Sequence, residues 1–111
     1  MFFFADKTTN VYDNGQGVVR TVLGYDGHMM IVRNDFETGA IGALHSHPHE
    51  QTTYVQSGRF LFTIDGEENE VKAGDALHKN PNVVHGCKCL EAGTLIDIFT
   101  PIREDFLPEQ Q

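Results

Sequence analysis

The chain has 111 residues and a formal net charge of −8 at pH 7, and aliphatic, aromatic and cysteine residues make up 40% of it. This length suits one domain with its own core, and this apolar content excludes a disordered chain. Because nucleic acids and anionic membranes are themselves negative, the charge disfavours both as partners, although a small anionic substrate needs only local positive charge.

The N-terminal segment Met1–Lys7 has neither a basic start nor a long apolar run. We therefore expect no secretory signal and no membrane-spanning segment. Within it, the aromatic run Phe2–Phe4 is suited either to a first strand over the domain's own core or to an interface with a second copy.

Short β-rich runs separated by glycine-containing turns follow along the rest of the chain. The predicted strands are Val18–Leu23, Met29–Phe36, Thr52–Gln56, Phe60–Ile64, Glu68–Lys72, Val83–Leu90 and Thr94–Phe99. Ser57–Arg59 is predicted to be a hairpin turn, and Asp65–Glu67 and Ala73–Asp75 are further predicted turns. Helical periodicity is absent apart from a candidate turn at Arg103–Leu107. Many short strands with regular turns predict an all-β sandwich or barrel in a single domain, residues 1–111.

Three histidines at alternate positions, His45, His47 and His49, precede Gln51. Side chains two residues apart in a strand point to the same face, so His45 and His47 can reach one ion, and Gln51 shares their side. His85 would join them from another strand. This pattern predicts a metal site, with a chance cluster of surface or core histidines as the alternative. We expect His49, which follows a proline, to lie outside the ligand set.

The two cysteines, Cys87 and Cys89, are two residues apart on one predicted strand. That spacing poorly suits a structural disulfide, so we expect reduced thiols in an intracellular, cytoplasmic protein. Packing in the core is the expectation for both thiols, and metal ligation is the alternative.

Glycines frame the histidines at regular distances. Gly39 stands before the first group and Gly58 after it, and a second group runs from Gly74 to His85-Gly86. These segments, which span residues 39–86, resemble the two motifs of the cupin family. The resemblance implies a small β-barrel of jelly-roll type.

The resemblance also implies a set of metal ligands. The family's ligands fall on His45, His47 and His85, and Gln51 stands where most cupins have a glutamate. A neutral amide leaves the charge of a divalent cation uncompensated, which makes a stronger Lewis acid and a better anchor for an anionic substrate. It also suits high oxidation states less well, which counts against a dioxygenase. Imidazole and amide ligands do not select among nickel, zinc, iron, manganese and cobalt.

A longer resemblance, carried by residues 40–60 and 90–107, is to the KdgF family of metal-dependent cupins, in which glutamine in the fourth ligand position is typical. Members convert cyclic 4,5-unsaturated monouronates, released by pectin or alginate lyases, into linear ketonised products. The resemblance implies that Asp97, Phe99 and Arg103 line the active site, within a segment, residues 94–107, that lines or closes the pocket. Arg103 would hold the substrate carboxylate and Asp97 would move a proton. Without the resemblance, Asp97 would be a structural carboxylate paired with an arginine, Phe99 a core residue and Arg103 part of a surface ion pair.

Three functions are therefore considered. The first is isomerase-type ketonisation of an unsaturated monouronate derived from pectin or alginate. The second is a cupin dioxygenase, and the third is a non-catalytic module that binds a sugar acid. In each case the exposed strand edges of a small barrel favour a homodimer.

Overall fold

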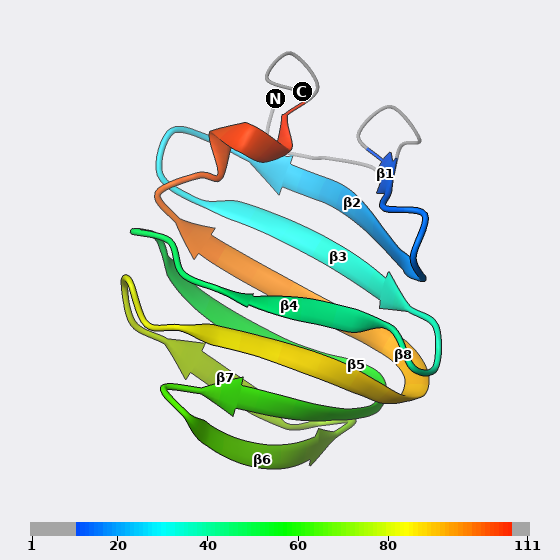
Figure 1. The fold of residues 1–111 in the computed structure, drawn as a ribbon. Coiled ribbons are helices and arrows are strands. Elements are labelled where there is room, and N and C mark those ends of the chain that lie inside the picture. Colours follow the sequence, from blue (N-terminus) through cyan, green and yellow to red (C-terminus); the bar gives the residue numbers. More distant parts are fainter. Residues whose placement is uncertain (1–10, 108–111) are drawn as a thin grey trace.

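The computed structural model describes residues 11–107, which form β-strands joined by short turns and end in one 3₁₀ turn (Figure 1). The strands are β1 Val11–Asp13, β2 Val18–Tyr25, β3 Met30–Phe36, β4 Ile41–His45, β5 Glu50–Ile64, β6 Glu67–Lys72, β7 Ala76–Lys79 and β8 His85–Thr100, and the 3₁₀ turn η2 is Glu104–Phe106. The predicted turn near the C-terminus is thus present, whereas Phe2–Phe4 lies outside the described residues. No helix in the described part is long and apolar enough to cross a membrane.

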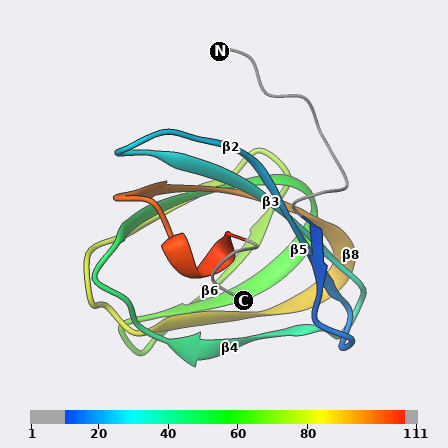
Figure 2. The ribbon, with the colours of Figure 1, turned by 90° about the horizontal axis from the view of Figure 1, so that it is seen from above.

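The strands form an antiparallel sheet in the order β1-β2-β3-β8-β5-β6, with β4 added to β8 and β7 added to β5. The two long strands, β5 and β8, pair along almost their whole length and carry the other strands on both sides. Seen from above, the sheet curls round on itself, and η2 lies across the upper end of the ring (Figure 2). This arrangement confirms the predicted all-β jelly-roll barrel.

Two sequence predictions about β5 and β8 are wrong. Ser57–Arg59 is not a hairpin but the bent middle of β5, and the predicted strands Val83–Leu90 and Thr94–Phe99 belong to the single strand β8. The cause is a close approach of the two paired backbones, where Gly58 has a φ of 83° and the pairing register shifts. A Cβ atom on Gly58 would lie 2.7 Å from the Cα atom of Gly93. Glycine here lets two strands bend together round the barrel instead of ending them.

The barrel interior has two apolar clusters. One contains Phe36, Ala40, Val55, Phe60, Phe62, Val71, Cys89 and Leu95, and the other contains Val22, Met30, Val32, Phe99 and Leu107. Buried polar side chains also point inward, among them Gln51, Thr53, Lys79, His85 and Asp97. Burying polar groups costs free energy unless they find hydrogen-bond partners, so a polar cluster inside a barrel is a candidate functional site.

Candidate metal centre

Three imidazoles converge at one end of the barrel. His45 is the last residue of β4 and lies opposite His85, the first residue of β8. His47 follows in the loop between β4 and β5, and the ligand atoms of all three rings lie within 4.8 Å of one another. The expected strand alternation of His45 and His47 is therefore wrong, although both rings reach the same point. The chain leaves the strand after His45, and the loop turns the His47 ring back toward the other two.

Backbone carbonyl groups set the tautomer of each ring. The Nδ1–H groups of His45, His47 and His85 donate to the carbonyl oxygens of Ala43, His49 and Val83 at 2.7, 3.0 and 3.0 Å. Each proton on Nδ1 leaves the Nε2 lone pair free for a ligand. The Nε2 atom of His85 is buried and has no hydrogen-bond partner. An unpartnered imidazole nitrogen beside two others fits a divalent metal ion.

The Gln51 side chain completes this group from β5. Its Oε1 atom lies 3.0 Å from Nε2 of His47, and its Nε2–H donates to Oδ1 of Asp97 at 2.8 Å. Because the His47 proton is on Nδ1, two lone-pair atoms face each other at that 3.0 Å contact. A cation beside both atoms resolves this repulsion, so the donor set fits a metal held by three imidazoles and one amide oxygen.

Burial favours the neutral form of the His47 and His85 rings. It lowers the pKa of His85 to about 4, and burial followed by the charge of Arg103 lowers the pKa of His47. The neutral imidazole is the form that binds a metal, so both rings are poised for ligation at pH 7. The His49 ring stacks edge-on against His47, with centroids 5.4 Å apart, and it is not part of the three-histidine cluster.

Asp97 lies on the cavity side of β8 and is only 5% exposed. Its carboxylate accepts hydrogen bonds from Gln51 Nε2 at 2.8 Å, from the Thr53 hydroxyl at 2.5 Å and from Asn34 Nδ2 at 2.7 Å. No arginine is among these partners, so the pairing with an arginine that the sequence offered as the alternative is not formed. Donors from β3 and β5 hold the carboxylate beside the amide that faces the histidines.

Arg103 follows β8 at the upper end of the barrel and is already paired. Its Nε and Nη2 groups donate to the two carboxylate oxygens of Asp105 at 3.0 and 2.9 Å, and these bonds lower the pKa of Asp105. The guanidinium also stacks on the Phe106 ring at 4.2 Å and lies 5.4 Å from the Phe99 centroid. The ion-pair alternative for Arg103 is therefore present, but the side chain is only 12% exposed and still lines the cavity.

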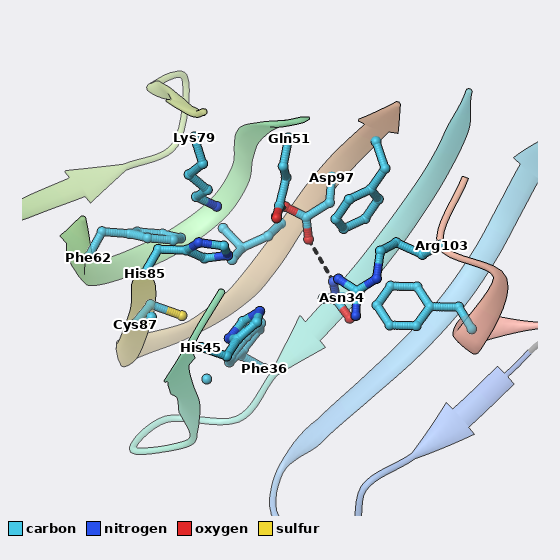
Figure 3. A pocket seen from close by; sticks show the side chains of 15 residues that line it. Asn34, Phe36, His45, Gln51, Phe62, Lys79, His85, Cys87, Asp97 and Arg103 are labelled. Carbon is cyan, nitrogen blue, oxygen red and sulfur yellow. Dashed lines mark hydrogen bonds between the residues drawn. The ribbon is translucent and has the colours of Figure 1, made fainter. Parts of the chain in front are cut away.

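A cavity of about 160 Å³ joins these groups (Figure 3). Of the residues named from the sequence, His45, Gln51, His85, Asp97, Phe99 and Arg103 line it. Asn34, Lys79, Cys87 and Phe106 line it as well. The sequence analysis singled out neither Asn34 nor Lys79, considered Cys87 only as an alternative metal ligand, and covered Phe106 only as part of the segment 94–107. The signal that could have identified Lys79 is its place two residues after Leu77, because the two residues share the inward face of β7.

Lys79 and the cysteines complete the inner wall. Burial lowers the pKa of Lys79, while the negative charge of Asp97 acts in the opposite sense. Both cysteines are unpaired, with Cys89 in the apolar core and Cys87 packed against that core as well as lining the cavity. Burial raises the pKa of the Cys87 thiol to about 11. A neutral thiol is a poor metal ligand, which agrees with its position outside the histidine cluster.

Comparison with known proteins gives consistent similarities. The cupin domain model matches residues 32–99. The pectin degradation protein KdgF of Dickeya dadantii (strain 3937) is 40% identical over 107 residues, which are 95% of this chain and 97% of that protein. An RmlC-like cupin from Shewanella frigidimarina NCIMB 400 superposes with a TM-score of 0.90 at 39% identity, covering 96% of both chains. The structure of KdgF from Halomonas sp. superposes with a TM-score of 0.89 at 32% identity, covering 96% of this chain and 99% of that chain.

Proposed function

The chain is a cupin of the KdgF family, and we propose that it acts in pectin degradation as a metal-dependent enzyme. The proposed reaction converts a cyclic 4,5-unsaturated monouronate, derived from pectin or alginate, into its linear ketonised form. The observation that carries the proposal is the 2.8 Å bond between Gln51 and Asp97. One amide turns its oxygen to the histidines and its nitrogen to an ionisable carboxylate, so metal ligands and a proton carrier share one cavity.

His45, His47, Gln51 and His85 would hold one divalent ion of nickel, zinc, iron, manganese or cobalt. When bound, this ion supplies Lewis-acid polarisation of a substrate oxygen. The neutral ligand set leaves its positive charge uncompensated by the protein, which favours an anionic sugar substrate and disfavours the dioxygenase alternative.

Asp97 is the proposed proton carrier. Opening the hemiacetal ring frees an enol, and ketonisation then moves a proton from the enol oxygen to carbon four, so the overall composition is unchanged. A carboxylate held by three hydrogen bonds at the cavity wall can accept the proton from oxygen and return it to carbon. The fixed orientation from Asn34, Gln51 and Thr53 keeps it aimed at one place.

Arg103 is the proposed anchor for the substrate carboxylate. Asp105 engages its Nε and Nη2 groups, so we expect the carboxylate at Nη1, which has two N–H donors. Stacking on Phe106 holds the guanidinium plane in position, and Phe99 supplies an apolar wall between the anchor and the histidines.

An assay on a lyase digest tests the function. Metal-stripped and metal-restored protein would be mixed with unsaturated monouronate, and the loss of its ultraviolet absorbance followed. We expect rapid decay only with the restored protein. Decay at the spontaneous rate would overturn the proposed reaction, and substrate-induced thermal stabilisation without turnover would favour a binding module.

We also propose a cytoplasmic homodimer. Two unpaired cysteines are consistent with a reducing compartment. Large apolar side chains, including Ile31 and Tyr54, are exposed on the outer face of the β3-β8-β5 sheet and offer a surface for a second copy. Light scattering of the purified chain is expected to give twice the mass of one chain, and a monomer mass at micromolar concentration would contradict the dimer.

A further inference from the structure

Lys79 is a buried cation that the proposed reaction does not use. Along β7 the exposed residues Ala76 and His78 alternate with the inward residues Leu77 and Lys79, and Lys79 pairs across the sheet with Gln51. It is only 2% exposed, although lysine is among the residues least often buried. Removing an amine from water costs several kcal/mol unless partners compensate, so its contacts call for a reason.

The contacts of Lys79 lead to Asp97 through one hydroxyl group. Its Nζ atom donates to Oγ1 of Thr53 at 2.6 Å and lies 4.6 Å above the Phe62 ring centroid. Within residues 11–107 no carboxylate forms a direct ion pair with it. Figure 3 shows Lys79, Gln51 and Asp97 pointing toward one another from β7, β5 and β8. The buried positive charge therefore meets the buried negative charge with Thr53 between them.

The Thr53 hydroxyl transmits this contact because it has a single proton. That proton goes to Oδ1 of Asp97, at 2.5 Å, so the lone pairs of Oγ1 face the remaining donors. They accept from Lys79 Nζ at 2.6 Å and from Gln51 Nε2 at 3.3 Å. The amine thus fixes the rotation of the hydroxyl, and the hydroxyl fixes the carboxylate.

We propose that Lys79 is a positioning residue of this site: it orients the Thr53 hydroxyl, which holds Asp97 in the orientation needed for proton transfer. Without Lys79, the hydroxyl loses the donor that sets its rotation, and the positive charge that bonds to the Thr53 partner of Asp97 is gone. The carboxylate then samples other orientations, and its bond to the Gln51 amide loosens with it. Misplacement of a reacting group by about 1 Å is enough to slow a reaction 100-fold.

Steady-state kinetics of metal-loaded variants test this role. Lys79→Met and Thr53→Val remove the two links while conserving much of the volume, and Thr53→Ser keeps the hydroxyl. We expect each of the first two variants to lower kcat roughly 10- to 100-fold with KM within about twofold of wild type. The kcat of the double variant should fall no further than that of the more impaired single variant. Thr53→Ser should retain most of the wild-type kcat. Lys72→Met, which removes an exposed lysine from β6, serves as the matched control.

Four results would overturn the proposal. One is an unchanged kcat in Lys79→Met. The second is a loss in the double variant equal to the product of the single losses, and the third is a loss confined to KM, since either would mean that Lys79 acts independently of Thr53. The fourth is equal activity of Thr53→Val and Thr53→Ser, a comparison that remains decisive if Lys79→Met does not fold.

The kinetic test rests on the proposed function, so a second measurement separates the two. Urea unfolding of the metal-free wild type, the single variants and the double variant needs no substrate. We expect the shifts in unfolding midpoint to be strongly non-additive, because both single changes break the same Lys79–Thr53 contact. Additive shifts would overturn the pairing itself. Absence of ketonisation by the wild-type protein would instead refute only the proposed reaction.

Discussion

At the scale of single residues, Gln51 links the two halves of the site. A glutamate at this position would place a second carboxylate against Asp97, and two adjacent carboxylates cannot both ionise without a large shift in pKa. The amide avoids this conflict, because its nitrogen donates to Asp97 while its oxygen faces His47. The neutral side chain at residue 51 thus avoids repulsion with Asp97, and it would also leave the charge of a bound divalent ion uncompensated.

Substitution Asp97→Asn tests the proton carrier directly. The amide keeps the size and most hydrogen bonds of the carboxylate but cannot exchange a proton at neutral pH. We expect kcat to fall roughly 100- to 10,000-fold, the range typical of removing a general acid or base. Metal content measured by mass spectrometry should stay at one ion per chain. Full activity in a variant with full metal content would falsify the role of Asp97.

The buried histidines predict how stability depends on pH in the metal-free protein. Their pKa values are lowered by burial, to about 4 for His85, so between pH 6.5 and about 4 the unfolded chain binds more protons than the folded chain. The free energy of unfolding should therefore be highest, as far as these histidines affect it, above pH 6.5. It should decline as the pH falls through this window. Urea denaturation at several pH values measures the decline.

His85→Gln should flatten that decline, whereas His28→Gln, on an exposed turn, should leave it unchanged. Equal slopes for both variants would show that other groups control acid stability.

At the scale of elements, β5 and β8 bend together where their backbones approach closely and their pairing register shifts. Each strand bends at a glycine, and beyond the bend it pairs with different neighbours: β8 with β4 on one side of it and with β3 on the other. The bend lets one strand supply His85 at its start and Asp97 near its end to the same cavity. The loop between β4 and β5 makes the other essential turn, because it returns His47 to the His45 ring.

Gly93→Ala should disrupt the pairing of β5 and β8 at this close approach. A methyl group on Gly93 would overlap the carbonyl oxygen of Ser57 and lie 2.6 Å from Cα of Gly58. Backbone atoms in two paired strands cannot move aside easily, so we expect the free energy of unfolding to fall by about 3 kcal/mol or more. Chemical denaturation measures the loss. Gly27→Ala, where an added Cβ meets nothing within 4 Å, is the matched control, and equal stability of the two variants would contradict this account.

At the scale of the whole molecule, an acidic chain places two of its basic residues in the wall of its internal cavity. The formal charge is −8, yet Arg103 and Lys79 both line the cavity. Acidic side chains elsewhere, such as Glu70 paired with Arg59, lie on the exposed surface. A small anion that enters the cavity therefore meets the positive charges of Arg103 and Lys79.

Metal binding should stabilise the entire fold, because the ligands come from β4, β5, β8 and a loop that are together only when folded. An ion at 100 times its Kd contributes about 2.7 kcal/mol. For a domain of this size that corresponds to a rise in Tm of roughly 10 °C. Thermal melts with and without nickel, cobalt or zinc measure the rise. His85→Ala should abolish most of it and His28→Ala should not, and a wild-type Tm indifferent to all these metals would rule out the site.

The sequence by itself determined the fold class, and it named a set of candidate metal ligands. Period-two alternation and glycine turns are local patterns, and they suffice to predict an all-β sandwich or barrel. The resemblance to the cupin family narrowed this to a jelly-roll barrel. The spacing of four residues, together with the family resemblance, was enough to identify them as candidate metal ligands: His45, His47, Gln51 and His85. The sequence analysis placed Gly58 in a turn, because a glycine in a turn and a glycine at a bend in a strand look alike until the partner strand is present.

Only the tertiary structure decided how the site is held together. The contacts that matter join residues far apart in the chain: Lys79 to Thr53 across 26 positions, and Asn34 to Asp97 across 63. No local pattern encodes such pairs, since they arise when β3, β5, β7 and β8 curl around one cavity. The pairing of Arg103 with Asp105 is local, whereas its position in the wall of the cavity that His45 and His85 also line depends on the folded barrel. The residue types were readable in the sequence, whereas their hydrogen bonds are a property of the closed barrel.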